Sequence, residues 1–343
     1  SIRRQRQMCI RDRCYYIFMD ISNNIVKRLG LFKNLVAEYR AGVFFHANLF
    51  YSPDKLTNEI FCKQVAKMLV CECGENGCEH CGSCLKIEKG TNPDVMFFGG
   101  TKFAVSDVEK IVEDQTLKPM ISPCKVYVIN KIDNGTIQAQ NKLLKVLEEP
   151  NPNVFFIINA TNLDSVLPTV KSRCKIMTIE PFDFGQVKEI FENERTQISE
   201  ILYSQSGGYV GKLMELVTGG DFADSLNLAR GIVFDMKNSK QVLGYSAELS
   251  SSKATFLTKL SLIQELYRDI MLSLLEQNGL QQSKEFAGKI EQVKNEFTVD
   301  ALVEIIDKID LCKKQFDANV NVGMIADGLL MKILEVKYLC KQK

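Results

Sequence analysis

The residues most clearly suited to chemistry are cysteines crowded into one short stretch, CECGENGCEHCGSC, at residues 71–84. Thiolates at this spacing suit a tetrahedral zinc ion, and a full set of four sulfurs leaves no position open for a substrate. Gly77 and Gly82 are expected to let the backbone fold tightly enough for the sulfurs to converge. We therefore predict a structural zinc site, and we assign it to four residues: Cys71, Cys78, Cys81 and Cys84.

Two further residues of the stretch compete for this ion. Cys73 and His80 are alternatives for the first and third ligand positions, and spacing alone does not exclude them. Free cysteines or a redox dithiol are the other interpretations of the cluster. A secreted disulfide framework is disfavoured, because the 12 cysteines are few for this length and their crowding is local.

A second candidate site is the turn in FHANLFYSPDKLTNEIF, which lies between an apolar run and a helical pattern. A phosphate loop there would need glycines for close backbone approach, a lysine for the terminal phosphates and a hydroxyl for magnesium. The turn has no glycine; it offers Ser52, Pro53, Asp54, Lys55, Leu56, Thr57, Asn58 and Glu59. Asp54 and Glu59 would repel phosphate, and Asn58 stands where the lysine should be. We predict that this chain binds no ATP.

The strand VYVINKID would carry the magnesium-binding acid and the water-activating acid of an ATPase at its carboxyl end. Asn130 and Lys131 occupy those places instead. Asp133 lies nearby, and we interpret it as a solvated loop acid. The sequence therefore predicts that both halves of an ATPase site are degenerate.

The elements that must position these residues alternate between strand and helix. A helix at 21–40 comes first, and continuous apolar runs such as VYVI and VFFII mark buried strands. Strands are expected at 43–51, 94–98, 125–132, 154–160 and 175–179, with helices at 54–70, 105–117 and 136–149 between them. The pattern predicts an α/β fold, with a parallel sheet that helices cover on both faces.

Strand patterns stop after Pro181. Helical segments at 187–194, 198–206 and 210–217, punctuated by glycines, predict a small helical domain over 181–240. Helical spacing continues from 255 to 339 without a strand signal, so a second all-helical domain is expected over 241–343.

Bulk composition narrows the class of protein. The 343 residues are 45% hydrophobic and carry a formal net charge of only +1. The net charge of the whole chain therefore does not indicate binding to nucleic acid or to a membrane surface. No apolar run is long enough to span a bilayer, and the cytoplasm is the expected location.

The first stretch, SIRRQRQMCIRDRCYYIF, is basic and does not resemble the rest of the chain. We interpret residues 1–18 as a non-native or disordered extension and expect the chain to start at Met19. The alternative is a basic arm that binds DNA.

Several segments in a fixed order resemble the bacterial clamp-loader family of AAA+ proteins. They are HANLF, the cysteine cluster, NPDV, NKLLKVLEEP and LPTVKSRC. The resemblance is strong from Met19 to Ile179, and NVNVGMIADGLLMKIL at 319–334 looks like the final collar helix of that family. The middle of the chain is matched only weakly.

This resemblance implies an AAA+ domain with a P-loop-like parallel sheet at 19–180, a zinc insertion at 71–84, a helical lid at 181–240 and an oligomerising collar at 241–343. Loss of the phosphate loop together with retention of Ser172, Arg173 and Cys174 resembles the non-catalytic branch of the family. The resemblance then implies that Arg173 acts in trans, as an arginine finger for ATP held by a neighbouring subunit.

The implied partners are the delta and gamma/tau subunits of a pentameric ring that opens the sliding clamp and places it on primed DNA during replication. The chain itself would be no enzyme, although the complex belongs to a DNA polymerase holoenzyme. Two alternatives stay open: an active ATPase of the gamma/tau type with an atypical phosphate loop, and a stand-alone zinc-containing protein that binds DNA.

Overall fold

The computed structural model describes residues 25–74, 76–99, 102–192, 198–218 and 221–341. They form two compact units: the first runs to Thr196 and includes Tyr209–Gly211, and the second comprises Gln197–Gly208 and the chain from Lys212 onward. The predicted extension at 1–18 and the start at Met19 lie outside the described residues. The finer division at 181–240 and 241–343 stays a prediction.

The first unit is built on a five-stranded parallel sheet in the order β2-β3-β4-β1-β5. This topology confirms the predicted α/β fold class. The strands are β1 (Ala47–Tyr51), β2 (Val95–Phe98), β3 (Lys125–Ile129), β4 (Val154–Ala160) and β5 (Lys175–Thr178).

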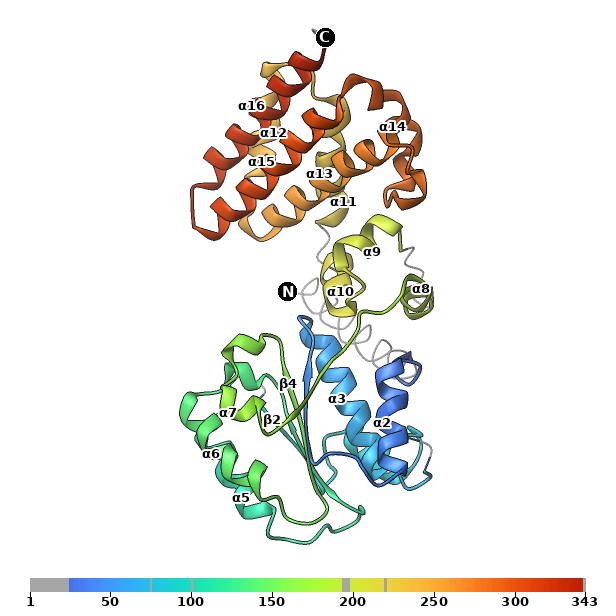
Figure 1. The fold of residues 1–343 in the computed structure, drawn as a ribbon, viewed down its shortest axis with the longest axis vertical. Coiled ribbons are helices and arrows are strands. Elements are labelled where there is room, and N and C mark those ends of the chain that lie inside the picture. The colour runs from blue at the N-terminus through green and yellow to red at the C-terminus, as the bar shows by residue number, and fades with distance from the viewer. Residues whose placement is uncertain (1–24, 75, 100–101, 193–197, 219–220, 342–343) are drawn as a thin grey trace, which may run out of the picture. The chain divides into compact units, whose positions relative to one another are not determined.

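Helices cover both faces of this sheet (Figure 1). One face carries α2 (Gly30–Arg40) and α3 (Lys55–Val70), and the other carries α5 (Val105–Asp114), α6 (Ile137–Glu148) and the short α7 (Pro168–Lys171). The central strands are apolar on both sides because both sides are covered: all five residues of β3 are buried. The first unit also contains α8 (Phe184–Glu192).

The first strand begins later than its apolar pattern predicted. Val43 is 68% exposed and Phe45 is 40% exposed, and β1 starts only at Ala47. An apolar run alone cannot distinguish a buried strand residue from an exposed one just before the sheet.

Asp94, at the entry to β2, fastens the loop that leads into β3. Its carboxylate accepts hydrogen bonds from the backbone N–H groups of Met120 (2.7 Å), Ile121 (2.8 Å) and Ser122 (2.8 Å). Burial opposes ionisation of Asp94, but these three donors hold its pKa below the ordinary 3.8.

Asp94→Asn is expected to lower the free energy of unfolding by about 2 kcal/mol or more, because hydrogen bonds to a charged acceptor weaken. Since the folded pKa lies below the unfolded one, this stabilisation is present at neutral pH and disappears as the pH falls through the folded pKa. Urea denaturation at several pH values tests this, with the exposed Asp164→Asn as control. If the free energies of unfolding of wild type and variant differ by the same amount down to acid pH, this prediction is wrong.

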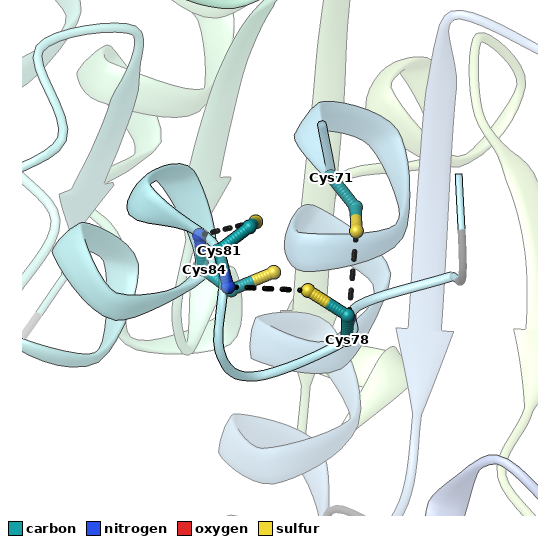
Figure 2. Close-up of side chains that lie close together, drawn as sticks. All are labelled: Cys71, Cys78, Cys81 and Cys84. Atoms are coloured by element: carbon teal, nitrogen blue, oxygen red, sulfur yellow. Dashed lines mark hydrogen bonds between the residues drawn. The ribbon is translucent and has the colours of Figure 1, made fainter. Parts of the chain in front are cut away.

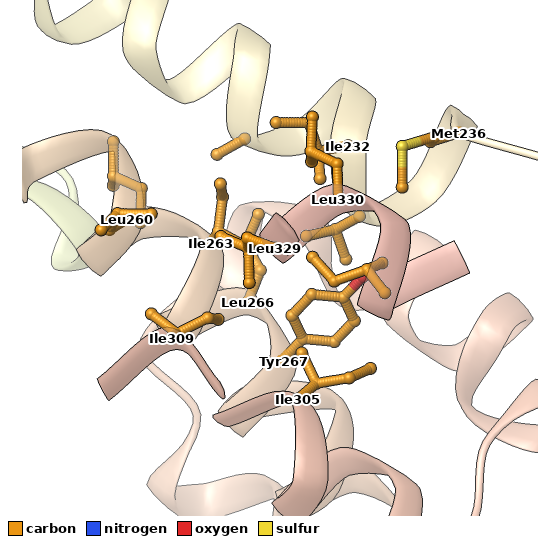
Figure 3. Close-up of a cluster of buried hydrophobic side chains, with 14 of the residues drawn as sticks. Ile232, Met236, Leu260, Ile263, Leu266, Tyr267, Ile305, Ile309, Leu329 and Leu330 are labelled. Carbon is orange, nitrogen blue, oxygen red and sulfur yellow. The ribbon is translucent and has the colours of Figure 1, made fainter. Parts of the chain in front are cut away.

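Among its described residues, the second unit contains helices and no strand, as the sequence predicted. Its helices are α9 (Glu200–Ser206), the greater part of α10 (Val210–Thr218), α11 (Phe222–Arg230), α12 (Ser239–Leu249), α13 (Lys253–Leu274), α14 (Ala287–Val293), α15 (Val299–Asp317) and α16 (Val322–Lys341). A single core joins α11 to α16, and Tyr267 of α13 lies within it, near Ile305 and Leu330 (Figure 3). None of the helices in the described part of the chain is long and apolar enough to cross a bilayer.

Candidate metal centre and candidate nucleotide site

The four predicted zinc ligands come together at the junction of two helices (Figure 2). Cys71 follows the last residue of α3, and Cys81 caps the N-terminus of α4 (Gly82–Glu88), whose first turn holds Cys84. Cys78 lies in the loop between the helices. The local sequence explains this arrangement, because α3 ends where the loop begins and the Cys81 side chain accepts the Cys84 N–H at the start of α4.

The geometry of these sulfurs fits a tetrahedral zinc ion. All four lie within 4.8 Å of one another, and a zinc ion with four thiolates separates its sulfurs by about 3.8 Å. Three backbone N–H groups also point at sulfurs: Cys78 to Cys71 (3.4 Å), Cys81 to Cys78 (3.2 Å) and Cys84 to Cys81 (3.4 Å). The four cysteines can therefore hold a metal such as zinc.

The thiols differ in how readily they ionise. Burial raises the pKa of Cys84. Burial acts in the same direction on Cys81, but hydrogen bonds that include the Cys84 N–H lower the pKa of Cys81 below the ordinary 9.0. A divalent cation would favour the thiolate form of all four side chains, because thiolates are the metal-ligating form.

Only one of the two glycines singled out in the sequence is conformationally required. Gly77 has φ of 90°, and a Cβ there would lie 2.6 Å from Nε2 of Gln64. That same Nε2 donates to the Asn76 carbonyl at 3.2 Å, which holds the loop against α3. Gly82 has ordinary clearance, since the nearest atom to its Cβ position is 3.6 Å away.

Cys73 and His80 are not members of the four-sulfur group, but they share Cys78 with it. The ligand atoms of Cys73, Cys78 and His80 lie within 4.8 Å of one another. The geometry places Cys71, rather than Cys73, with Cys78, Cys81 and Cys84.

The turn after β1 contains a carboxylate where a phosphate loop would bind phosphate. Asp54 caps α3: its Oδ2 accepts the N–H of Thr57 at 3.0 Å and the Thr57 hydroxyl at 2.5 Å. The same Oδ2 accepts the backbone N–H of Gly211 at 2.9 Å, in the first turn of α10. A helix N-terminus is a natural anion site, and here the chain's own carboxylate takes it.

The other residues of this turn are also engaged. Asn58, in the place of the lysine, is buried and donates to the carbonyls of Ser52 (2.8 Å) and Ala160 (3.1 Å). Lys55 lies 3.4 Å from Glu59 one turn along α3, and Ser52 Oγ accepts the Asp54 N–H at 3.2 Å.

Asn130 and Lys131, which stand in the places of the two acids, directly follow β3, and both contact Asn159 of β4. Asn159 donates to Asn130 Oδ1 at 2.7 Å, and its own Oδ1 accepts the N–H of Lys131 at 2.9 Å. Neutral side chains that hydrogen-bond to one another offer magnesium none of the carboxylates it is usually held by.

The interpretation of Asp133 as a solvated loop acid is wrong. Its Oδ2 accepts hydrogen bonds from the Thr161 N–H (3.2 Å), the Thr161 hydroxyl (2.7 Å) and the Asn162 N–H (3.1 Å). Asp133 fastens the turn after β3 to the end of β4, a structural use that spacing in the sequence did not reveal.

Arg173 follows α7 and is paired within its own chain. Its Nε donates to Glu148 Oε1 at 2.6 Å and its Nη1 to the Thr169 carbonyl at 2.9 Å, while its side chain remains 32% exposed. Ser172 Oγ donates to the same Thr169 carbonyl at 3.0 Å. Cys174 packs against the sheet core, and burial raises its pKa to about 12, so it is a packing residue in this motif.

Sequence reasoning missed Gly211 and Asn159. A polar residue inside the apolar run VFFIINA was a usable signal for Asn159, whereas nothing local marks Gly211. A Cβ on Gly211 would lie 2.1 Å from Oδ1 of Asp54, so the close approach of the Gly211 backbone to this carboxylate requires glycine.

Gly211→Ala is therefore expected to break the Asp54–Gly211 hydrogen bond and to lower the free energy of unfolding by about 1–3 kcal/mol through overpacking. Gly244→Ala is the matched control, because it lies in α12 with nothing within 4 Å of its Cβ position and should be neutral or stabilising by up to about 1 kcal/mol. Thermal and urea unfolding measure both. Equal effects of the two substitutions would show that the contact with Asp54 is not tight.

The sheet order, the helices on both faces and the helices that follow define a parallel α/β domain followed by an all-helical region. A family model described as "DNA polymerase III, delta subunit" matches residues 28–183. Over these residues, the chain is similar to the delta-subunit family of DNA polymerase III.

Curated relatives match most of the chain at low identity. DNA polymerase III subunit delta' of Bacillus subtilis (strain 168) is 23% identical over 285 residues, which covers 79% of this chain and 85% of the relative. Subunit delta' of Haemophilus influenzae is 24% identical over 329 residues, 90% of this chain and 96% of the relative. Subunit gamma of Buchnera aphidicola subsp. Acyrthosiphon pisum is 28% identical over 259 residues, 68% of this chain and 70% of the relative.

Proposed function

We propose that this protein is a non-catalytic subunit of the delta' type. The observation that carries the proposal is the Asp54 carboxylate, which accepts hydrogen bonds from the first turns of both α3 and α10. A triphosphate at this turn would have to displace a carboxylate that is already satisfied, and it would meet like charge as it approached.

The neighbouring residues support the same proposal. Asn58 cannot supply the positive charge that a phosphate-loop lysine gives to the terminal phosphates, and it is committed to two carbonyls. After β3, Asn130 and Lys131 stand where an ATPase would carry its magnesium-binding and water-activating acids, and Asn130 accepts a hydrogen bond from Asn159. Binding and hydrolysis would thus be lost for separate reasons.

Titration of the purified full-length chain with a fluorescent ATP analogue and magnesium tests this. We expect no saturable binding in the micromolar range, with an intact gamma/tau subunit as the positive control. Saturable binding that competes with unlabelled ATP would instead support an active subunit of the gamma/tau type. The chain is also similar to gamma subunits.

The proposed role is that of a stator in the ring formed with delta and gamma/tau subunits. The protein would hold the ring's geometry while the ring loads the sliding clamp onto primed DNA, would lend Arg173 to a neighbour, and would act in the cytoplasm. The four-cysteine cluster would hold one structural zinc ion.

Co-purification with delta and gamma/tau, followed by a clamp-loading assay, tests the partners. Tight, salt-sensitive binding of primed DNA by the isolated chain would favour the stand-alone DNA-binding alternative.

A further inference from the structure

A second group of ligand atoms lies on the outer side of the zinc cluster. It consists of Cys73, Cys78 and His80, whose sulfur and nitrogen atoms lie within 4.8 Å of one another. Cys73 and His80 are exposed, and Cys78 is shared with the four-cysteine group. Thiolate and imidazole are the ligands that zinc prefers.

The His80 ring is oriented as a metal ligand is. Its Nδ1 lies 2.8 Å from the Cys78 carbonyl oxygen. Because a carbonyl can only accept, Nδ1 donates in this contact, and in the neutral ring the lone pair is then on Nε2. Metal-ligating histidines are commonly fixed through this kind of bond from the other ring nitrogen. This Nε2 lies 4.0 Å from Cys73 Sγ, close to the separation of about 3.6 Å that a nitrogen and a sulfur have on one tetrahedral zinc ion.

The backbone around Cys78 is bent in an unusual way. Asn76 has φ of 59°, Gly77 of 90° and Glu79 of 69°, so left-handed residues flank Cys78 on both sides. Such conformations are costly for residues other than glycine and persist where the surrounding structure imposes them. Here they place the Cys78 sulfur between the inner cysteines and the Cys73–His80 pair.

We propose that Cys73, Cys78 and His80 bind a second zinc ion, with Cys78 as a thiolate that bridges it to the inner ion. On binding, the Cys73 thiol loses its proton to solvent and His80 coordinates as the neutral imidazole. Three protein ligands leave the fourth position to water. The outer ion is therefore bound more weakly than the inner one and exchanges with the medium.

A single ion that takes its ligands from both groups does not fit this arrangement. The two sets share only Cys78, and the inner cysteines already complete a tetrahedron. This inference concerns metal content alone, and it stands or falls independently of whether the turn at Asp54 binds ATP.

Zinc titration of the metal-free full-length chain under reducing conditions tests the proposal, with a chromophoric chelator as competitor and metal content measured by mass spectrometry. Wild type is expected to bind two equivalents, of which the weaker is released to the chelator first. Cys73→Ser and His80→Gln should each abolish the weaker equivalent and leave the tight one unchanged. Cys340→Ser and His46→Gln, which alter a cysteine and a histidine outside both groups, should retain both equivalents.

Cobalt titration gives a second readout. The second equivalent should add thiolate-to-cobalt absorption that is missing from Cys73→Ser. Two results would overturn the proposal: wild type that saturates with one equivalent, or Cys73→Ser and His80→Gln variants that weaken the tight ion. The latter would make Cys73 and His80 ligands of the inner ion.

Discussion

Arg173→Ala is expected to leave assembly with delta and gamma/tau intact while sharply lowering DNA-stimulated ATP hydrolysis by the ring. An arginine supplied in trans stabilises the charge that develops on the transferred phosphoryl group, and its loss costs about a thousandfold or more at the site it completes. Total turnover should fall towards the rate of the sites that this subunit does not serve. Steady-state hydrolysis by the reconstituted complex, with and without primed DNA, measures the effect.

The ion pair with Glu148 supplies the control that separates this role from a structural one. In the chain itself Arg173 donates to Glu148 and to the Thr169 carbonyl, so a purely structural arginine would act through these contacts. Glu148→Gln removes the charged partner and keeps the guanidinium. If Arg173 serves a neighbour, Glu148→Gln should retain hydrolysis that Arg173→Ala loses.

The two roles also predict different effects on stability. A half-exposed pair such as this contributes about 0–1 kcal/mol, so both variants should unfold almost as wild type does. Arg173→Lys should recover little activity, because an ammonium cannot grip two oxygens in the guanidinium's planar geometry. Equal losses of turnover in Arg173→Ala and Glu148→Gln, or unchanged turnover in both, would refute the proposed trans role.

The fold could be predicted from the sequence because its signals are local. Apolar runs such as VFFII mark strands that are covered on both faces, and helical spacing marks the segments between them. The structure places β4 at the predicted residues 154–160 and ends β3 three residues before the predicted bound. Strand ends depend on pairing with neighbouring strands and on exposure, as at Val43. A local sequence pattern indicates neither.

The candidate sites were predictable to different depths. The cysteine spacing located the four-cysteine cluster, since its members lie within one loop and the adjoining helix ends. The loss of the phosphate loop could also be predicted, but not what fills it, because Asp54 meets Gly211 across 157 residues of chain. Asp133 was misjudged for a related reason: its partners, Thr161 and Asn162, come after a different strand.

Removal of zinc is expected to loosen the loop at 71–84, α4 and the C-terminal part of α3, while the sheet stays folded. The reason lies in Lys67 of α3, which is only 1% exposed and whose Nζ lies 3.9 Å from Glu79 and 3.6 Å from Glu88. Both carboxylates belong to the segment that the cysteines pin in place. If that segment moves away, a buried ammonium loses its partners, which costs about 3–5 kcal/mol for a fully buried pair and less here because the acids are partly exposed.

Hydrogen exchange and limited proteolysis of the metal-free protein and of Cys84→Ser measure this effect, with Cys340→Ser as the thiol control. Protection should be lost in α4 and at the end of α3 and kept in β3 and β4.

Lys67→Met tests the mechanism, because an apolar side chain of similar length carries no charge that could be left without a partner. In that variant, zinc removal should still free the loop but should no longer loosen α3. Full protection of the 71–84 loop without metal would show that the cysteines are not a structural zinc site. Equal loosening of α3 in Lys67→Met and in wild type would show that Lys67 does not couple zinc removal to α3.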